Sequence, residues 1–277
     1  MNATTRFQSL DLSSRFQPIF GVAERRAVGY EALLTASDLE GVSVPPAALF
    51  ARAHALGETV YLDWMARALH LRNFHTIDPD ETRHLFMNVA PRTALEDLRF
   101  PSVFAAVMET FEIDPHRVVI EILEDEVENE ARLAEAVAYY RAFGCAIALD
   151  DFDGSVHCGE RLARLLPDVV KIARPLVNAA GMDPGARRLL NDTVATIHAF
   201  GASVVLEGVE TRVEAQVAID TGAECVQGYY FAMPATRRAD EALVAQRFAD
   251  LAVSPGSAPR RAPRRAPWPA RPSGMAS

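Results

Sequence analysis

Six short apolar runs in this sequence each end at a charged or amide side chain. The runs are rich in β-branched residues and alternate with helical patterns, which is typical of the buried strands of a parallel sheet. A polar group at the end of a buried strand is costly unless it joins a shared polar site or binds a metal ion. The residues that end the six runs are Asn88, Glu121, Asp150, Lys171, Glu207 and Gln227.

This pattern predicts an α/β fold, a TIM-type (β/α)8 barrel, because in such a barrel the C-terminal ends of the strands meet on the face that carries the active site. Three helical patterns also end at Gly144, Gly201 and Gly222, and a strand pattern follows each of them at once. Glycine takes the left-handed conformation that commonly ends a helix, so we expect repeated βα units. A chain of 277 residues with 49% hydrophobic residues can bury the core of one such domain.

The barrel is expected to begin irregularly. Strand patterns over residues 15–20 and 27–34 are joined by a turn at residues 21–26. A connection this short predicts an antiparallel hairpin, and therefore an antiparallel first strand. A helix is expected after Pro45 and Pro46, and another after Gly57. The apolar residues that predict the buried face of this second helix are Val60, Tyr61, Trp64, Met65, Ala68 and Leu69.

These patterns divide the chain into an N-terminal lead (residues 1–14), a barrel domain (15–253) and a Pro- and Arg-rich tail (254–277). The composition of the tail predicts disorder, and it leaves open whether the tail is inert or is a basic arm that binds an acidic partner. The net charge of −9 argues against a DNA-binding surface. No transmembrane run or secretory signal is visible, and Cys145 and Cys225 fit as small core residues, so we expect a cytoplasmic protein.

The residues that end the strands also indicate a chemistry. Carboxylate and carboxamide oxygens are the ligands of Mg²⁺ or Mn²⁺, and Glu31 on the hairpin adds another carboxylate. The adjacent Asp150 and Asp151 repel each other unless cations neutralise them. Two divalent ions that share one aspartate would do so and would activate water for attack on a phosphate ester. Lys171 is suited to orient that water or stabilise the transition state, and Glu207 to act as a ligand or general base.

The sequence resembles the EAL-domain family of bacterial cyclic-di-GMP phosphodiesterases and their degenerate relatives. The resemblance covers about residues 15–235, and its motifs occur in family order. They are Phe16–Gln17–Pro18–Ile19, Glu31–Ala32–Leu33, Met87–Asn88–Val89, Glu121–Ile122–Leu123–Glu124, Asp150–Asp151–Phe152, Val170–Lys171–Ile172, Glu207–Gly208–Val209–Glu210–Thr211 and Gln227–Gly228–Tyr229.

The resemblance implies hydrolysis of cyclic di-GMP to linear pGpG with two Mg²⁺ or Mn²⁺ ions, by a homodimer that acts in second-messenger signalling. It implies that Asp150 bridges the two ions, with Asp151 on the second side. Glu207 is implied as the base and Lys171 as its partner near the nucleophilic water. The other implied roles are metal binding for Glu31, Asn88 and Glu121, substrate binding for Gln17, Leu33 and Gln227, and loop support for Glu124 and Glu210.

The sequence departs from the family pattern near the substrate. Thr35 stands where the family usually has an arginine that contacts a substrate phosphate, and Ala173 replaces an acidic residue. Leu123 replaces a threonine, and residues 153–158 replace a Gly-rich support loop. His157 and Cys158 in this loop are adjacent, so they are not expected to form a nucleophile–base pair. An alternative function therefore stays open, a weak or inactive EAL module that acts as a cyclic-di-GMP receptor or a protein-interaction scaffold.

Overall fold

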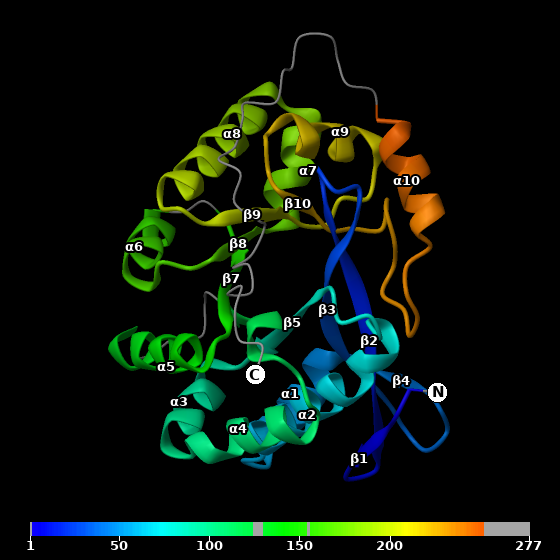
Figure 1. The fold of residues 1–277 in the computed structure, drawn as a ribbon, viewed down its shortest axis with the longest axis vertical. Helices are drawn as coiled ribbons and strands as arrows, with labels where there is room; N and C mark the ends of the chain where they lie inside the picture. The colour runs from blue at the N-terminus through cyan, green and yellow to red at the C-terminus, as the bar shows by residue number, and fades with distance from the viewer. Residues whose placement is uncertain (1, 124–129, 154–155, 252–277) are drawn as a thin grey trace, which may run out of the picture.

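The structure is a computed structural model that describes residues 2–123, 130–153 and 156–251 (Figure 1). The strands are β1 (Thr5–Phe7), β2 (Leu10–Gly21), β3 (Arg26–Ser37), β4 (Ser43–Val44), β5 (His84–Val89), β6 (Val118–Leu123), β7 (Ala146–Phe152), β8 (Val169–Ile172), β9 (Ser203–Leu206) and β10 (Cys225–Val226). The helices are α1 (Pro46–Ala55), α2 (Thr59–Ile77), α3 (Pro91–Arg99), α4 (Pro101–Thr110), a 3₁₀ turn (Pro115–Arg117), α5 (Glu130–Phe143), α6 (Val156–Leu165), α7 (Arg174–Met182), α8 (Pro184–Ala199), α9 (Arg212–Asp220) and α10 (Glu241–Ala249).

Eight of these strands close into a barrel. Strands β3, β5, β6, β7, β8, β9 and β10 follow one another in parallel pairs. Strand β2 closes the barrel by pairing antiparallel with both β3 and β10. The predicted barrel with an antiparallel first strand is therefore confirmed. The hairpin strands begin and end further out than predicted, so the segment expected as an N-terminal lead contains β1 and the start of β2.

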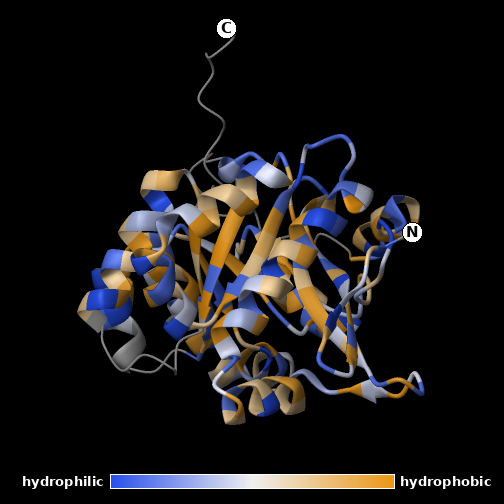
Figure 2. Ribbon diagram, turned by 90° about the horizontal axis from the view of Figure 1, so that it is seen from below, coloured by the Kyte–Doolittle hydropathy of each residue, from blue (hydrophilic) through white to orange (hydrophobic). Residues whose placement is uncertain are grey.

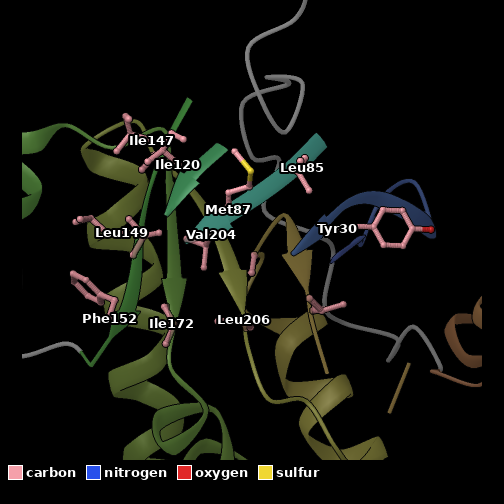
Figure 3. Packing of buried hydrophobic residues seen from close by; sticks show 14 of the residues in the cluster. Tyr30, Leu85, Met87, Ile120, Ile147, Leu149, Phe152, Ile172, Val204 and Leu206 are labelled. Atoms are coloured by element: carbon pink, nitrogen blue, oxygen red, sulfur yellow. The ribbon is translucent and has the colours of Figure 1, made fainter. Parts of the chain in front are cut away.

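Alternation along each strand produces two apolar layers. The outer layer includes Leu85, Ile120 and Leu149, which pack between the barrel and the surrounding helices (Figure 3). The inner layer fills the barrel with alternate residues such as Phe86 and Val119. Figure 2 shows the same arrangement, with mostly hydrophobic strands at the centre and polar residues toward the outside of the helices. Because successive side chains of a strand point to opposite faces, each inward apolar residue is followed two positions later by another inward residue.

That next inward residue is polar on most of the strands. Asn88 follows Phe86, Glu121 follows Val119, and Lys171 follows Val169 in this way. The apolar layer thus fills the lower barrel, and the polar residues gather above it at the C-terminal ends of the strands. None of the helices among the described residues combines the length and apolarity that a membrane span requires.

The glycine-ended helices are found as predicted. Helices α5, α8 and α9 are each followed closely by a glycine with positive φ, and these glycines are Gly144 (109°), Gly201 (82°) and Gly222 (81°). The predicted core positions of Cys145 and Cys225 are also confirmed, since both side chains are buried and carry free thiols. The predicted tail, residues 254–277, lies outside the described residues.

The predicted buried face of α2 was wrong in part. Tyr61 is 57% exposed, while Leu62 and Phe74 are fully buried. The helix also buries polar side chains, because Arg67 lies between Asp63 (3.1 Å) and Asp97 of α3 (2.7 Å). Buried polar groups are tolerated where they pair, and here the pairing fixes α2 against α3.

A buried histidine connects α2 to the first barrel strand. The His70 Nδ1 atom lies 2.8 Å from the Ser14 hydroxyl, and both side chains are buried. Burial lowers the pKa of His70 to about 3. Since the unfolded chain has a histidine pKa of about 6.5, the unfolded state takes up a proton below that pH that the folded state does not. The stabilisation from neutral His70 is therefore present above about pH 6.5 and is lost as the pH falls.

We predict that His70→Gln will be less stable than the unmodified chain near neutral pH, and that this gap will narrow in acid. The gap in unfolding free energy should shrink by about 2 kcal/mol between about pH 7.5 and about pH 5, because the unmodified chain alone then loses the contribution of neutral His70. Urea unfolding of both proteins at the two pH values measures the gap. A gap that stays constant would show that the fold does not hold His70 neutral.

Candidate functional site

The ammonium group of Lys171 lies at the centre of the polar site. Its Nζ atom is 2.7 Å from Glu121, 2.7 Å from Glu207, 3.1 Å from Asp150 and 3.2 Å from Glu31. The four carboxylates come from β3, β6, β7 and the end of β9, and Lys171 itself belongs to β8. The side chain of Lys171 is 1% exposed, so one buried cation holds the upper ends of five strands together.

Lys171 is also the only lysine in the sequence, and the other 27 of the 28 basic residues are arginines. The two residue types are not interchangeable at such a site. An ammonium group is a compact point charge with three donors, whereas a guanidinium is a flat fork suited to one carboxylate. A centre surrounded by four carboxylates from different directions therefore requires lysine.

Burial changes the acidity of these groups. Burial raises the pKa of Glu207 to about 8, although the Lys171 ammonium acts in the opposite direction. Burial also raises the pKa of Glu121 well above its usual range, again against the pull of Lys171. Burial opposes the charge of Lys171, but the surrounding carboxylates raise its pKa well above the usual value. Glu207 is therefore a carboxylate that can exchange a proton near neutral pH.

Amide side chains complete the rim of the cluster. Asn88 donates to Glu31 Oε1 (3.3 Å), and Gln227 donates to Glu31 Oε2 (2.7 Å). Gln17 lies directly opposite Glu31 in the antiparallel pair of β2 and β3, and Leu33 follows two positions later on the same face. Gln17 and Leu33 both line the cavity above the cluster, as do Gln227 and Glu207.

Asp151 occupies an unusual backbone position. Its φ is +57°, and the pairing of β7 with β8 is irregular between Leu149 and Phe152. Aspartate tolerates the left-handed region better than most residues, and such positions often occur at functional sites. The irregular backbone brings the side chains of both consecutive aspartates to the same site. Ligand atoms of Asp150, Asp151 and Glu207 all lie within 4.8 Å of one another.

The donor set fits divalent metal ions. Glu121 Oε2 and Gln227 Oε1 are buried and accept no hydrogen bond from any residue that the structure describes. Five carboxylates and one ammonium group give the cluster of Glu31, Glu121, Asp150, Asp151, Glu207 and Lys171 a formal charge of −4, which two divalent cations would balance. Oxygen-only ligands are those that Mg²⁺, Mn²⁺ and Ca²⁺ prefer.

Two glycines hold Glu207 in place. Gly208 has φ of +62°, and a Cβ atom there would lie 2.4 Å from the Arg174 side chain. A Cβ atom on Gly228 would lie 2.1 Å from the backbone oxygen of Val209. Only glycine allows this close approach, so the segment after β10 packs directly against the segment after β9, and Gly208 packs against Arg174.

The next residues support the site from outside. Glu210 accepts a hydrogen bond from Arg174 (2.6 Å), and both line the cavity. The predicted role of Glu210 in loop support agrees with this contact but stays a prediction. Glu124, the other residue predicted to support the loop, lies outside the described residues.

Arg174 and Glu214 were missed in the sequence analysis. The Thr211–Glu214 capping box at the start of α9 was visible as a Thr-x-x-Glu pattern, whereas no local pattern marks Arg174.

Two connected depressions lie above the cluster. The smaller has a volume of about 420 Å³ and contains the acidic groups, Lys171 and Ala173. The larger has a volume of about 1270 Å³ and extends along β3 toward α1 and α2. Leu33 and Tyr229 line both, so a ligand bound at the cluster can extend into the larger cavity. A volume above about 300 Å³ is typical of sites for small organic ligands.

The family described as EAL domain matches residues 2–234. This chain belongs to the EAL-domain family. The uncharacterized EAL-domain protein YkuI of Bacillus subtilis is 27% identical over 242 residues, which cover 86% of this chain and 58% of YkuI. The cyclic di-GMP phosphodiesterase RocR of Pseudomonas aeruginosa is 30% identical over 152 residues, 54% of this chain and 38% of RocR. The EAL chain thus spans less than two thirds of either relative.

Solved EAL structures share this fold. YkuI in complex with cyclic di-GMP and calcium superimposes with a TM-score of 0.73 at 24% identity, covering 87% of this chain and 59% of that one. The manganese and cyclic di-GMP complex of BlrP1 from Klebsiella pneumoniae gives 0.72 at 23% identity, covering 84% and 58%. EAL structures of this shape therefore bind calcium or manganese together with cyclic di-GMP.

We predict that replacing the central cation will destabilise the protein in a way that metal ions reverse. Lys171→Met leaves the carboxylates without their buried partner, and in EDTA it should lower the unfolding free energy by about 3–5 kcal/mol. Added Mn²⁺ should then raise the melting temperature of Lys171→Met more than that of the unmodified chain, because the ion replaces lost charge compensation.

Scanning calorimetry with EDTA and with Mn²⁺ measures both effects. The exposed Arg26→Met serves as the control for loss of a positive charge. Equal metal-induced shifts in all three proteins would contradict the view that Lys171 and metal ions neutralise the same carboxylates.

Proposed function

We propose that this chain is a metal-dependent phosphodiesterase that hydrolyses cyclic di-GMP to linear pGpG in bacterial second-messenger signalling. The observation that carries the proposal is the convergence of four carboxylates on Lys171 below an open cavity, within a member of the EAL family. The similarity to RocR, whose name states this activity, supports it further. From the resemblance of the sequence to the EAL-domain family, we also propose that the active form is a homodimer.

The proposed metal ligands divide into two groups. Glu31, Asn88, Glu121 and Asp150 would hold one Mg²⁺ or Mn²⁺ ion, and Asp150 would share the second with Asp151. When bound, such ions lower the pKa of coordinated water and neutralise phosphate charge. The buried unpaired oxygen of Glu121 and the formal charge of the cluster support this assignment.

Glu207 is the proposed general base. Its carboxylate is 17% exposed at the edge of the cavity, and its Oε1 atom accepts from Lys171 at 2.7 Å. In the proposed hydrolysis, the water oxygen forms a bond to phosphorus and Glu207 takes a proton from this water. The bond between phosphorus and one ribose oxygen breaks, and that oxygen takes up a proton from solvent water and leaves as a hydroxyl group. Lys171 fixes the orientation of Glu207, and its positive charge favours the charge that develops on the phosphoryl oxygens.

A specific observation favours a second function, a weak or inactive module that binds the nucleotide or a protein partner. Thr35 cannot supply the guanidinium of the family arginine, and its hydroxyl is engaged by Ser13 Oγ (2.7 Å). Incubation with cyclic di-GMP and Mg²⁺ or Mn²⁺, followed by nucleotide chromatography, separates the two functions. Formation of pGpG supports the enzyme, whereas binding without product supports the module.

We predict that Glu207→Gln will lower turnover about 100-fold or more while nucleotide binding survives, because the amide keeps the size of the side chain and cannot accept the proton. Product formation under single-turnover conditions and calorimetric titration of nucleotide measure the two effects. Glu109→Gln, on the exposed face of α4, is the matched control. Near-normal turnover in Glu207→Gln would remove this residue from the mechanism.

A further inference from the structure

One arginine of the larger cavity has no role in the cluster described above. Arg15 is exposed on β2, and it is the only lysine or arginine among the described residues that line this cavity. It makes no hydrogen bond or ion pair with any residue that the structure describes. An unpaired guanidinium in a ligand-sized cavity is a binding group for an anion.

The register of the hairpin places Arg15 beside the acidic cluster. Gln17 pairs with Glu31, Arg15 with Leu33, and Ser13 with Thr35, all on the face that lines the cavities. Arg15 is thus the diagonal neighbour of both Glu31 and Thr35. Diagonal neighbours in an antiparallel pair lie about 7–8 Å apart, within reach of long side chains. An arginine side chain at position 15 and one at position 35 can therefore reach the same part of the cavity.

The other cations of the two cavities are already engaged. Lys171 contacts four carboxylates, and Arg174 is paired with Glu210 at 2.6 Å. A doubly charged ligand that enters beside the acidic cluster still needs compensation for its second negative group. Of the lysine and arginine side chains that line these cavities among the described residues, Arg15 is the one left to provide it.

We propose that Arg15 binds the phosphodiester of the cyclic dinucleotide that is not being hydrolysed. This inference rests on the proposed function. The ligand has two phosphodiesters, and when one reacts at the acidic cluster the other must lie further along the cavity. The Thr35 side chain is short and is hydrogen-bonded to Ser13, so it leaves this part of the cavity open. The longer side chain of Arg15, which pairs with Leu33, can occupy this space. Arg15 would then replace, from the neighbouring strand, the arginine that position 35 lacks.

Calorimetric titration of the full chain with cyclic di-GMP in Ca²⁺ tests the proposal, since Ca²⁺ accompanies this nucleotide in the YkuI complex. Arg15→Ala and Arg15→Gln should each weaken binding roughly 10- to 100-fold, the range for loss of a charge-assisted hydrogen bond. The affinity of both variants should also depend less on salt concentration than that of the unmodified chain, because one phosphate contact is gone. Arg15→Lys should recover only part of the affinity, because it keeps the charge and loses the fork.

Two further variants of the same hairpin give a control for the loss of an arginine and a test of whether binding can be restored. Arg26→Ala removes an exposed arginine at the opposite end of β3, outside both cavities, and should bind like the unmodified chain. Adding Thr35→Arg to the Arg15→Ala variant should restore affinity for cyclic di-GMP. The gain in affinity from Thr35→Arg should be larger in that variant than in the unmodified chain.

Two results would overturn the inference in distinguishable ways. If the unmodified chain binds cyclic di-GMP and both Arg15→Ala and Arg15→Gln bind equally well, Arg15 is not a phosphate ligand, while the proposed function stands. If the unmodified chain does not bind cyclic di-GMP at all, the proposed function fails and this inference fails with it. Circular dichroism confirms that each variant is folded, as expected for an exposed side chain.

Discussion

The attraction between one ammonium group and four carboxylates is the interaction on which the site depends. Lys171 reaches Glu31, Glu121, Asp150 and Glu207 within 3.2 Å, and each of them belongs to a different segment of the barrel. Unpaired, these carboxylates would repel one another in a region of low dielectric. The remaining negative charge makes the site attractive for divalent cations. Stability and chemistry are thus coupled at the same atoms.

The barrel brings these charged groups together at the ends of its strands, and the hairpin of β2 and β3 extends beyond them. Parallel strands such as β8 are short, with 4 residues, and end at the cluster. Strands β2 and β3 have 12 residues each and continue past it. The projecting part of the hairpin lines the larger cavity with residues 32–37 of β3 and with Ser13 and Arg15 of β2. The antiparallel first strand therefore extends the acidic mouth of the barrel into the larger cavity.

Much of this was predictable from the sequence, because strand period, helix-ending glycines and polar residues at strand ends are local patterns. The strand-end pattern alone placed Asn88, Glu121 and Lys171 toward the C-terminal ends of their strands, where the structure has them. The buried face of α2 was not predictable, because Asp63 and Arg67 have the sequence pattern of solvent-facing residues and are buried only by pairing with Asp97 from another helix. The left-handed backbone of Asp151 and the position of Arg15 also depend on strand register, which composition and periodicity do not specify.

A chain with one lysine also has only one side-chain amine, and in this protein it lies at the centre of the candidate site. Incorporation of ¹⁵N-lysine would therefore give a single ammonium resonance in a nuclear magnetic resonance spectrum. Because Lys171 is almost completely buried, its protons are shielded from exchange with water. The chemical shift of this one nucleus would report directly on the charge around it, so the chain carries a built-in probe of its own candidate site without any labelling chemistry at the surface.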